Sequence, residues 1–210
     1  MTVSPFVPWP ADETLVLASR SPRRAELLRT AGIPFEVRPA GDVEGEHAAR
    51  LARLHDDPDP YAEELARLKA QAVADLAPGR LVLGADTIVV LAGAVLEKPR
   101  DEAEARAMLA RLSGRRHTVI SAIALCGRGG RTWLGHESTE VEFLPLDPAA
   151  IAAYVETGEP MDKAGAYGIQ GYGALMVRGV TGCYFNVMGL PLALLGQALR
   201  EVLDPEGDPA

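Results

Sequence analysis

Residues 81–91 form an apolar run that carries a single charged side chain, Asp86, near its middle. Aliphatic and β-branched residues without polar alternation are typical of a strand that is covered on both faces. An unpaired carboxylate in such a strand costs free energy, so Asp86 must have partners or lie where the strand opens onto a cleft. We expect Gly84 to leave room for that opening. An aspartate that only braces a turn at the strand end is the alternative.

The residues after this strand are predicted to fold back onto it. A tight turn at 92–94 allows residues 95–96 to pair with the strand as a β-hairpin. Glu97 and Lys98 would then lie near Asp86. The hairpin therefore supplies a first candidate cation for the isolated carboxylate.

Lysine is rare in this chain. Only three of the 21 basic residues are lysine, namely Lys69, Lys98 and Lys163. Lysine provides a compact ammonium with an adjustable pKa, which arginine does not replace. Lys69 lies on the apolar stripe of a helix predicted over 61–76, which aims it along that face into a cleft. Chance retention of three lysines, and a Lys69 that extends to solvent along the helix, are the alternatives.

A helix predicted to begin at Ser21, after a short strand at 14–18, carries arginines where helices favour acidic residues. The N–H groups at a helix start, a serine hydroxyl and several guanidinium groups together form a binding site for phosphate. The arginines concerned are Arg20, Arg23 and Arg24. The alternative is that they are solvated and paired with Glu26 or Glu36.

Two loops are candidates for ligand binding. Residues 158–173 are too glycine-rich for a helix or strand and predict a binding loop, in which Gln170 offers a donor and an acceptor to a base edge and Tyr167 offers a ring for stacking. Glycines with a purely structural role are the alternative. The acidic loop at 41–47 offers a metal ligand, although solvated carboxylates are the more common case.

The remaining patterns mix strands with helices, and no linker divides the chain. Further strands are predicted at 33–38, 118–126, 131–144 and 174–178, and further helices at 101–114, 147–158 and 190–203. We expect one α/β domain over 1–210, with its core at about 14–203.

Composition excludes several classes of partner. The net charge of −8 argues against general binding to nucleic acid or anionic membranes, so an anionic ligand needs a local basic cluster. No apolar stretch approaches the roughly 20 residues that span a bilayer, and no signal peptide is evident, so we expect a soluble, cytoplasmic protein. Cys126 and Cys183 lack metal or redox spacing and are predicted to be free, buried thiols. P-loop, zinc-hydrolase and nucleophile-elbow motifs are missing.

Five ordered motifs resemble the Maf family of nucleoside triphosphate pyrophosphatases. They lie at 17–28, 84–87, 96–99, 112–114 and 158–171, and the resemblance covers about residues 14–200. It implies a mixed, twisted α/β sheet with flanking helices and a cleft between two lobes, similar to inosine triphosphate pyrophosphatases. It also implies hydrolysis of a nucleoside triphosphate to the monophosphate and pyrophosphate with a divalent cation, Mg²⁺ or Mn²⁺. A homodimer is left open.

The resemblance assigns roles to individual residues. The family's catalytic aspartate falls on Asp86, which would accept the proton of the attacking water. The combination of Arg23, Thr87 and Gln170 resembles the branch that acts on dTTP and UTP, and modified pyrimidine nucleotides are a further option. Independently of the resemblance, Lys69 and Lys98 are expected to help neutralise the triphosphate. The metal ligands are left unassigned. The alternative from another class is a non-catalytic nucleotide-binding regulator of cell division.

Overall fold

The computed structural model describes residues 4–10, 13–127 and 132–203. Within them, seven strands form one sheet in the order β2-β1-β3-β5-β6-β7, with β4 paired to β3. β1 is parallel to β2 and to β3, and the other pairs are antiparallel, so the sheet is mixed as the sequence predicts. The strands are β1 (Leu15–Leu17), β2 (Phe35–Val37), β3 (Val82–Leu91), β4 (Ala94–Leu96), β5 (Arg116–Cys126), β6 (Thr132–Phe143) and β7 (Val177–Thr181).

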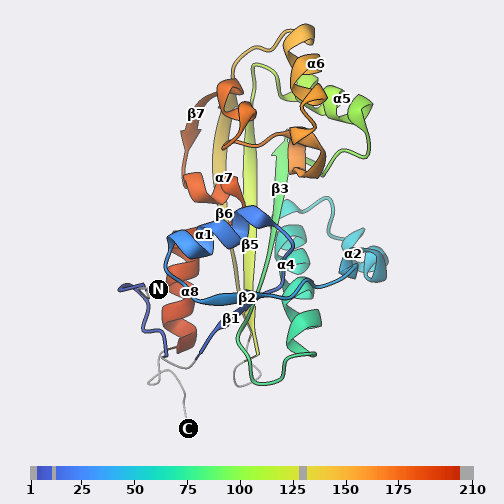
Figure 1. Cartoon of the computed structure of the whole chain (residues 1–210). Coiled ribbons are helices and arrows are strands. Elements are labelled where there is room, and N and C mark those ends of the chain that lie inside the picture. The colour runs from blue at the N-terminus through green and yellow to red at the C-terminus, as the bar shows by residue number, and fades with distance from the viewer. Residues whose placement is uncertain (1–3, 11–12, 128–131, 204–210) are drawn as a thin grey trace.

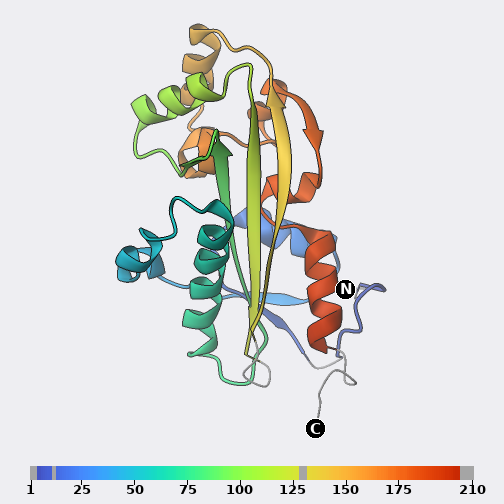
Figure 2. The same cartoon turned by 180° about the vertical axis from the view of Figure 1, so that it is seen from behind.

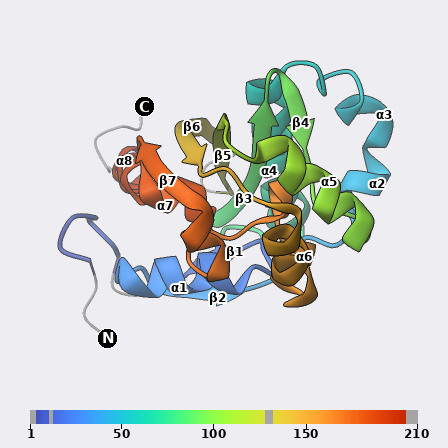
Figure 3. The ribbon, with the colours of Figure 1, turned by 90° about the horizontal axis from the view of Figure 1, so that it is seen from above.

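Strands β3, β5 and β6 run through both halves of the molecule and connect them (Figure 1). The lower lobe in that view holds β1, β2, α1 (Pro22–Thr30), α4 (Pro58–Ala74) and α8 (Leu192–Leu203). The upper lobe holds β7, α5 (Glu102–Leu112) and α6 (Pro148–Glu156). From behind, α4 and α8 flank the long strands on opposite sides (Figure 2), and the view from above shows the same arrangement (Figure 3). The predicted architecture of two lobes on one flanked sheet is confirmed.

Short helices connect these parts. They are α2 (Val43–Glu46), α3 (Ala48–Leu51), α7 (Tyr184–Met188) and the 3-10 helices η1 (Glu159–Asp162), η2 (Ala164–Ala166) and η3 (Tyr172–Met176).

Each lobe has its own apolar core. In the lower lobe, Leu28 of α1 and Leu195 of α8 pack with Leu83 of β3, and all three side chains are fully buried. In the upper lobe, Leu109 of α5 packs in one cluster with Phe143 of β6. A third apolar cluster joins Leu65 of α4 to Ile88 of β3 and Ile120 of β5.

Several predicted elements differ from those observed. The strand predicted at 174–178 is wrong, because residues 172–176 form η3 and the strand follows at 177–181. The acidic stretch predicted as a loop contains α2, where the Asp42 carboxylate accepts from Gly45 N and caps the helix start. Helix α7 was not predicted, because five residues are too short for a helical period to show. Most of the predicted connection at 127–130 lies outside the described residues.

In the part of the chain that the structure describes, no helix is both long and apolar enough to cross a membrane. Cys126 and Cys183 are free thiols as predicted, but only Cys126 is buried.

Candidate active site

Asp86 lies in a gap along one edge of β3. On that edge β1 pairs with β3 at Val82 and Leu83, and β4 pairs with it only from Val89 to Leu91. The opposite edge is paired throughout, with Asp86 opposite Ala122 of β5. The carboxylate therefore occupies the stretch where the strand opens between the lobes, as its isolation in an apolar run predicts.

Close packing of α4 brings Lys69 onto Asp86. A Cβ atom on Gly84 would lie 2.2 Å from the carbonyl oxygen of Ala66 and 2.5 Å from the nitrogen of Ala70, so only glycine admits the helix at this distance. The expectation that Gly84 leaves room for the cleft is wrong, because the helix occupies that space. Lys69 is one turn along the same face, and its Nζ lies 2.5 Å from Asp86 Oδ1.

Lys69 bridges two carboxylates. Its Nζ also lies 2.7 Å from Glu44 Oε1, contributed by α2. Burial on its own would lower the pKa of Lys69, but Asp86 and Glu44 outweigh it and the pKa ends above its usual range. Lys69 is therefore a fixed cation near neutral pH, and it cannot serve as the base.

The arginines at the start of α1 take three different positions. Ser21 caps the helix by accepting from Arg24 N, as predicted. The guanidinium of Arg24 turns inward and donates to Thr87 Oγ1 at 3.2 Å, to Ser19 Oγ at 3.1 Å and to the Gly189 carbonyl at 2.9 Å. Burial lowers the pKa of Arg24, the nearby Asp86 opposes this, and Arg23 adds to it. Arg24 thus ties α1 to β3 and to the end of α7.

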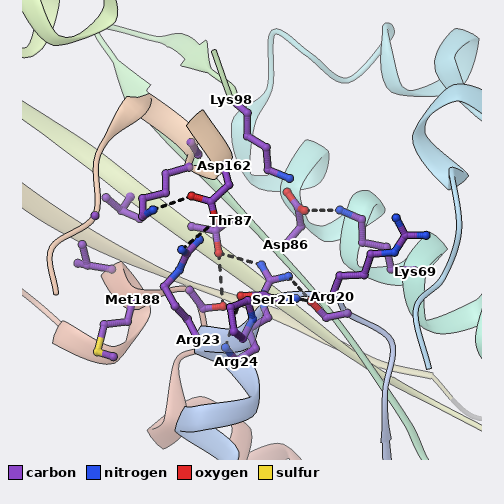
Figure 4. Close-up of a pocket in the computed structure, with 18 of the residues that line it drawn as sticks. Arg20, Ser21, Arg23, Arg24, Lys69, Asp86, Thr87, Lys98, Asp162 and Met188 are labelled. Atoms are coloured by element: carbon purple, nitrogen blue, oxygen red, sulfur yellow. Dashed lines mark hydrogen bonds and ion pairs between the residues drawn. The ribbon is translucent and has the colours of Figure 1, made fainter. Parts of the chain in front are cut away.

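Arg23 and Arg20 face the cleft instead (Figure 4). Arg23 Nη1 lies 3.2 Å from Asp162 Oδ2, which joins α1 to η1 across the cleft. The alternative pairing with Glu36 is not observed, since that carboxylate contacts Arg38 and Arg80.

Thr87 is held from both sides. Its hydroxyl accepts from Arg24 and lies 2.8 Å from Ser121 Oγ on β5. Ser121 is held in turn by Asn186 of α7, which is fully buried and also donates to Val119 O. Thr87 is therefore positioned as a support for Arg24 as well as a lining residue of the cleft.

A cavity of about 410 Å³ collects these groups. This volume is within the range of small-molecule sites. Its lining includes the cations Arg20, Arg23, Arg24, Lys69, Lys98 and Lys163, and the carboxylates Glu44, Asp86 and Asp162. Cations outnumber carboxylates two to one in a chain of net charge −8. The cavity is therefore a local site for an anion, and all three lysines of the chain lie in it.

The hairpin and the glycine-rich loop complete the cavity. Lys98, which follows β4, and Gln170 both line it, as predicted. Glu97 is not among the lining residues, and its carboxylate accepts from the Tyr61 hydroxyl at 2.5 Å. Tyr167 also lines the cavity, with its ring largely buried edge-on against Phe143 at a centroid distance of 4.7 Å, and its stacking on a base stays a prediction.

A divalent metal fits this site only if the substrate shares in holding it. Among the described residues, no group of three or more His, Cys, Asp or Glu side chains is placed to hold a metal ion. Asp86 and Glu44 nevertheless converge on one cation, the ammonium of Lys69. Mg²⁺ is commonly held by one or two carboxylates together with substrate phosphates and water. These two carboxylates match that donor set.

Some residues of the site could not be singled out from the sequence. Asp162 lies in the glycine-rich loop, where the glycines, Tyr167 and Gln170 give the sequence signal. Its contact with Arg23 joins residues 139 positions apart, which no sequence pattern indicates. Asn186 carries a weak signal, as a polar residue inside the short apolar stretch 184–188. Glu44 was included only as one of several acidic residues in its loop.

Comparison with known proteins identifies the family. The family described as "Maf-like protein" matches residues 14–202. The chain belongs to this family. A relative from Symbiobacterium thermophilum named dTTP/UTP pyrophosphatase is 53% identical over 90% of this chain and 94% of its own length. A relative with the same name from Koribacter versatilis is 48% identical over 89% of this chain and 93% of its own length.

Solved structures share weaker similarity with this Maf-family chain. The Staphylococcus aureus Ham1 protein is 17% identical, with a TM-score of 0.41 over 62% of this chain and 72% of its own. A nucleoside-triphosphatase, dITP/XTP pyrophosphatase, from Mycobacterium abscessus is 18% identical, with a TM-score of 0.43 over 92% of this chain and 98% of its own. The family assignment rests on the sequence relatives.

Proposed function

We propose that this Maf-family hydrolase converts dTTP and UTP to the monophosphate and pyrophosphate, with Asp86 as the proton acceptor. The observation that carries the proposal is the position of Asp86 at the open edge of β3, inside a cavity where cations outnumber carboxylates. The names of the relatives support the reaction and the choice of substrate. The chain is accordingly a nucleoside triphosphate pyrophosphatase.

The chemistry places a water molecule between Asp86 and the α-phosphate. As the water oxygen bonds to the α-phosphorus, its proton passes to the Asp86 carboxylate. The bond between the α-phosphorus and the bridging oxygen breaks, and pyrophosphate leaves with the electron pair. Lys69 orients the Asp86 carboxylate through its short contact, and Arg23 and Lys98 would stabilise the charge that builds on the leaving group.

A divalent cation, Mg²⁺ or Mn²⁺, is part of the proposal. Asp86 and Glu44 would hold it together with the substrate phosphates. When bound, such an ion polarises phosphoryl oxygens and neutralises charge. The Lys69 ammonium contacts both carboxylates and so reduces the repulsion between their negative charges.

Base recognition is assigned to Gln170. Its carboxamide can accept from N3–H of thymine or uracil and donate to an adjacent carbonyl. Its position among the residues that line the cavity supports this role. Modified pyrimidines with the same edge would also be substrates.

The test is release of pyrophosphate from dTTP and UTP in the presence of Mg²⁺ or Mn²⁺. We expect release from both, and much slower release from dCTP and GTP. Binding of dTTP, seen as a rise in Tm, without any release would favour the regulatory alternative.

The assembly state is a separate proposal. A homodimer in solution would give twice the chain mass by light scattering, and a measured mass of one chain would contradict it.

A further inference from the structure

Gln170 lies in a turn that is supported by two side chains outside the cavity. One of them belongs to α6 and the other to η1, which follows α6. The turn runs from Gly168 to Gly171, whose nitrogen donates to the Gly168 carbonyl at 3.4 Å. The two supporting residues are Tyr154, on α6, and Glu159, at the start of η1. Tyr154 is buried, and neither residue lines the cavity.

Their contacts bracket Gln170 on both sides. Before it, Gly168 N donates to the Tyr154 hydroxyl at 3.1 Å, and that hydroxyl donates to Glu159 Oε1 at 2.8 Å. After it, Tyr172 N donates to Glu159 Oε2 at 2.9 Å, and Gly173 N donates to Oε1 at 3.2 Å. Three backbone N–H groups around one glutamine therefore depend on this pair of side chains.

The glycines of the loop match this support. A Cβ atom on Gly171 would lie 2.2 Å from Glu159 Oε2. A Cβ atom on Gly173 would lie 2.5 Å from the Gly168 carbonyl oxygen and 3.0 Å from the Tyr154 hydroxyl. Gly171 thus admits the Glu159 carboxylate, and Gly173 admits both the Tyr154 hydroxyl and the turn that carries Gln170. Burial alone would raise the pKa of Glu159, but the N–H groups and the Tyr154 hydroxyl more than offset it, and the pKa lies below its usual range.

We propose that Tyr154 and Glu159 are positioning residues that fix Gln170 for selection of the base. The inference rests on the proposed function, because it requires Gln170 to read a pyrimidine. A recognition group must be held within a fraction of an ångström by residues that support it. Residues 164–176 contain only two short 3-10 helices, η2 and η3, and the turn between them. Side-chain acceptors therefore take the place of the regular backbone hydrogen bonds that a long helix or strand would provide.

The experiment compares Tyr154→Phe and Glu159→Gln with two matched controls. Tyr184→Phe removes a hydroxyl from an exposed tyrosine on α7, and Glu156→Gln removes a charge from an exposed position on α6. For each protein, kcat and KM are measured for dTTP and dCTP, and the affinity for each nucleotide is measured by calorimetry. Hydrogen exchange is followed in the peptide covering residues 164–176.

We expect the preference for dTTP over dCTP to fall about tenfold in Tyr154→Phe and in Glu159→Gln, mainly through KM for dTTP. Exchange in the 164–176 peptide should accelerate in both, and the controls should match the wild type. An unchanged preference, or an equal loss on both nucleotides, would overturn the inference whatever the exchange shows.

Failure of the proposed function gives a different result. A wild-type protein that releases no pyrophosphate would refute the proposed reaction, and the ratio of affinities for dTTP and dCTP would then decide the role of the supporting pair. Faster exchange with an unchanged affinity ratio would count against it.

Discussion

The two walls of the cavity are built differently. The wall that carries Asp86 and Lys69 consists of a strand and a long helix, packed so closely at Gly84 that no side chain fits between them. The wall that carries Gln170 consists of turns and short 3-10 helices, held by backbone N–H groups that donate to side chains. Under the proposed function, the reacting groups stand on the closely packed core of the fold, and the group that reads the base stands on a loop. Selectivity can change in such a protein without disturbing the reacting groups.

Removing the carboxylate of Asp86 should have the largest effect. Asp86→Asn keeps the size and shape of the side chain but loses the proton acceptor, so we expect kcat for dTTP to fall about a thousandfold with an unchanged far-UV CD spectrum. Asp56→Asn, at an exposed position outside the cavity, is the matched control. Turnover in Asp86→Asn within a few-fold of the wild type would remove Asp86 from the role of base.

Substitution of Lys69 should come next. Lys69→Ala leaves Asp86 and Glu44 facing each other without the cation between them, and we expect kcat/KM to fall about a hundredfold. Lys69→Arg tests whether lysine itself is needed, because the larger guanidinium does not fit the same short contacts. A Lys69→Arg variant as active as the wild type would show that any cation suffices. Replacing all three lysines by arginine extends this test to the whole cavity.

Acid should lower the stability of the fold through His117. His117 of β5 is buried with its Nε2 2.9 Å from the Tyr167 hydroxyl, and burial lowers its pKa to about 4. The His117 ring has a pKa of about 6.5 in the unfolded chain and about 4 in the folded protein. Between these pH values the ring is protonated mainly in the unfolded chain, so the unfolding free energy falls as the pH falls. From pH 7.5 to 5 we expect a loss of about 2 kcal/mol at this residue.

Urea unfolding at these two pH values measures that loss. The loss should be smaller in His117→Gln, which has no ring to protonate. An identical pH dependence in the variant would mean that His117 does not carry this effect.

Release of Arg23 should have the smallest effect. Asp162 is largely exposed, yet Arg23 and Lys163 outweigh the effect of its partial burial and hold its pKa below the usual range. Asp162→Asn should free the Arg23 guanidinium for the substrate and raise kcat/KM for dTTP about two- to fivefold. A lower kcat/KM in the variant would show that Asp162 contributes to substrate binding.

The sequence predicted the catalytic wall better than the recognition wall. Asp86 and Lys69 stand in long regular elements, where an isolated charge in an apolar pattern is easily seen. The position of Gln170 in the cavity was also predicted, but Tyr154, Glu159 and Asp162 act through contacts that depend on how a loop turns. No period in the sequence encodes such contacts, and the same irregularity explains why η3 was predicted as a strand.

Under the proposed function, the reaction depends on the wall that carries Asp86, and the choice between a pyrimidine and a purine depends on the wall that carries Gln170. The most direct test is the ratio of kcat/KM for dTTP to that for GTP, measured in the wild type, Asp86→Asn and Gln170→Glu. We expect Asp86→Asn to lower kcat/KM for dTTP and for GTP by the same factor, so that the ratio stays unchanged. Gln170→Glu loses a donor and places a charge beside the pyrimidine carbonyls. The ratio should therefore fall by an amount that corresponds to about 1–3 kcal/mol of transition-state free energy. A ratio that changes in Asp86→Asn, or that stays constant in Gln170→Glu, would contradict the claim.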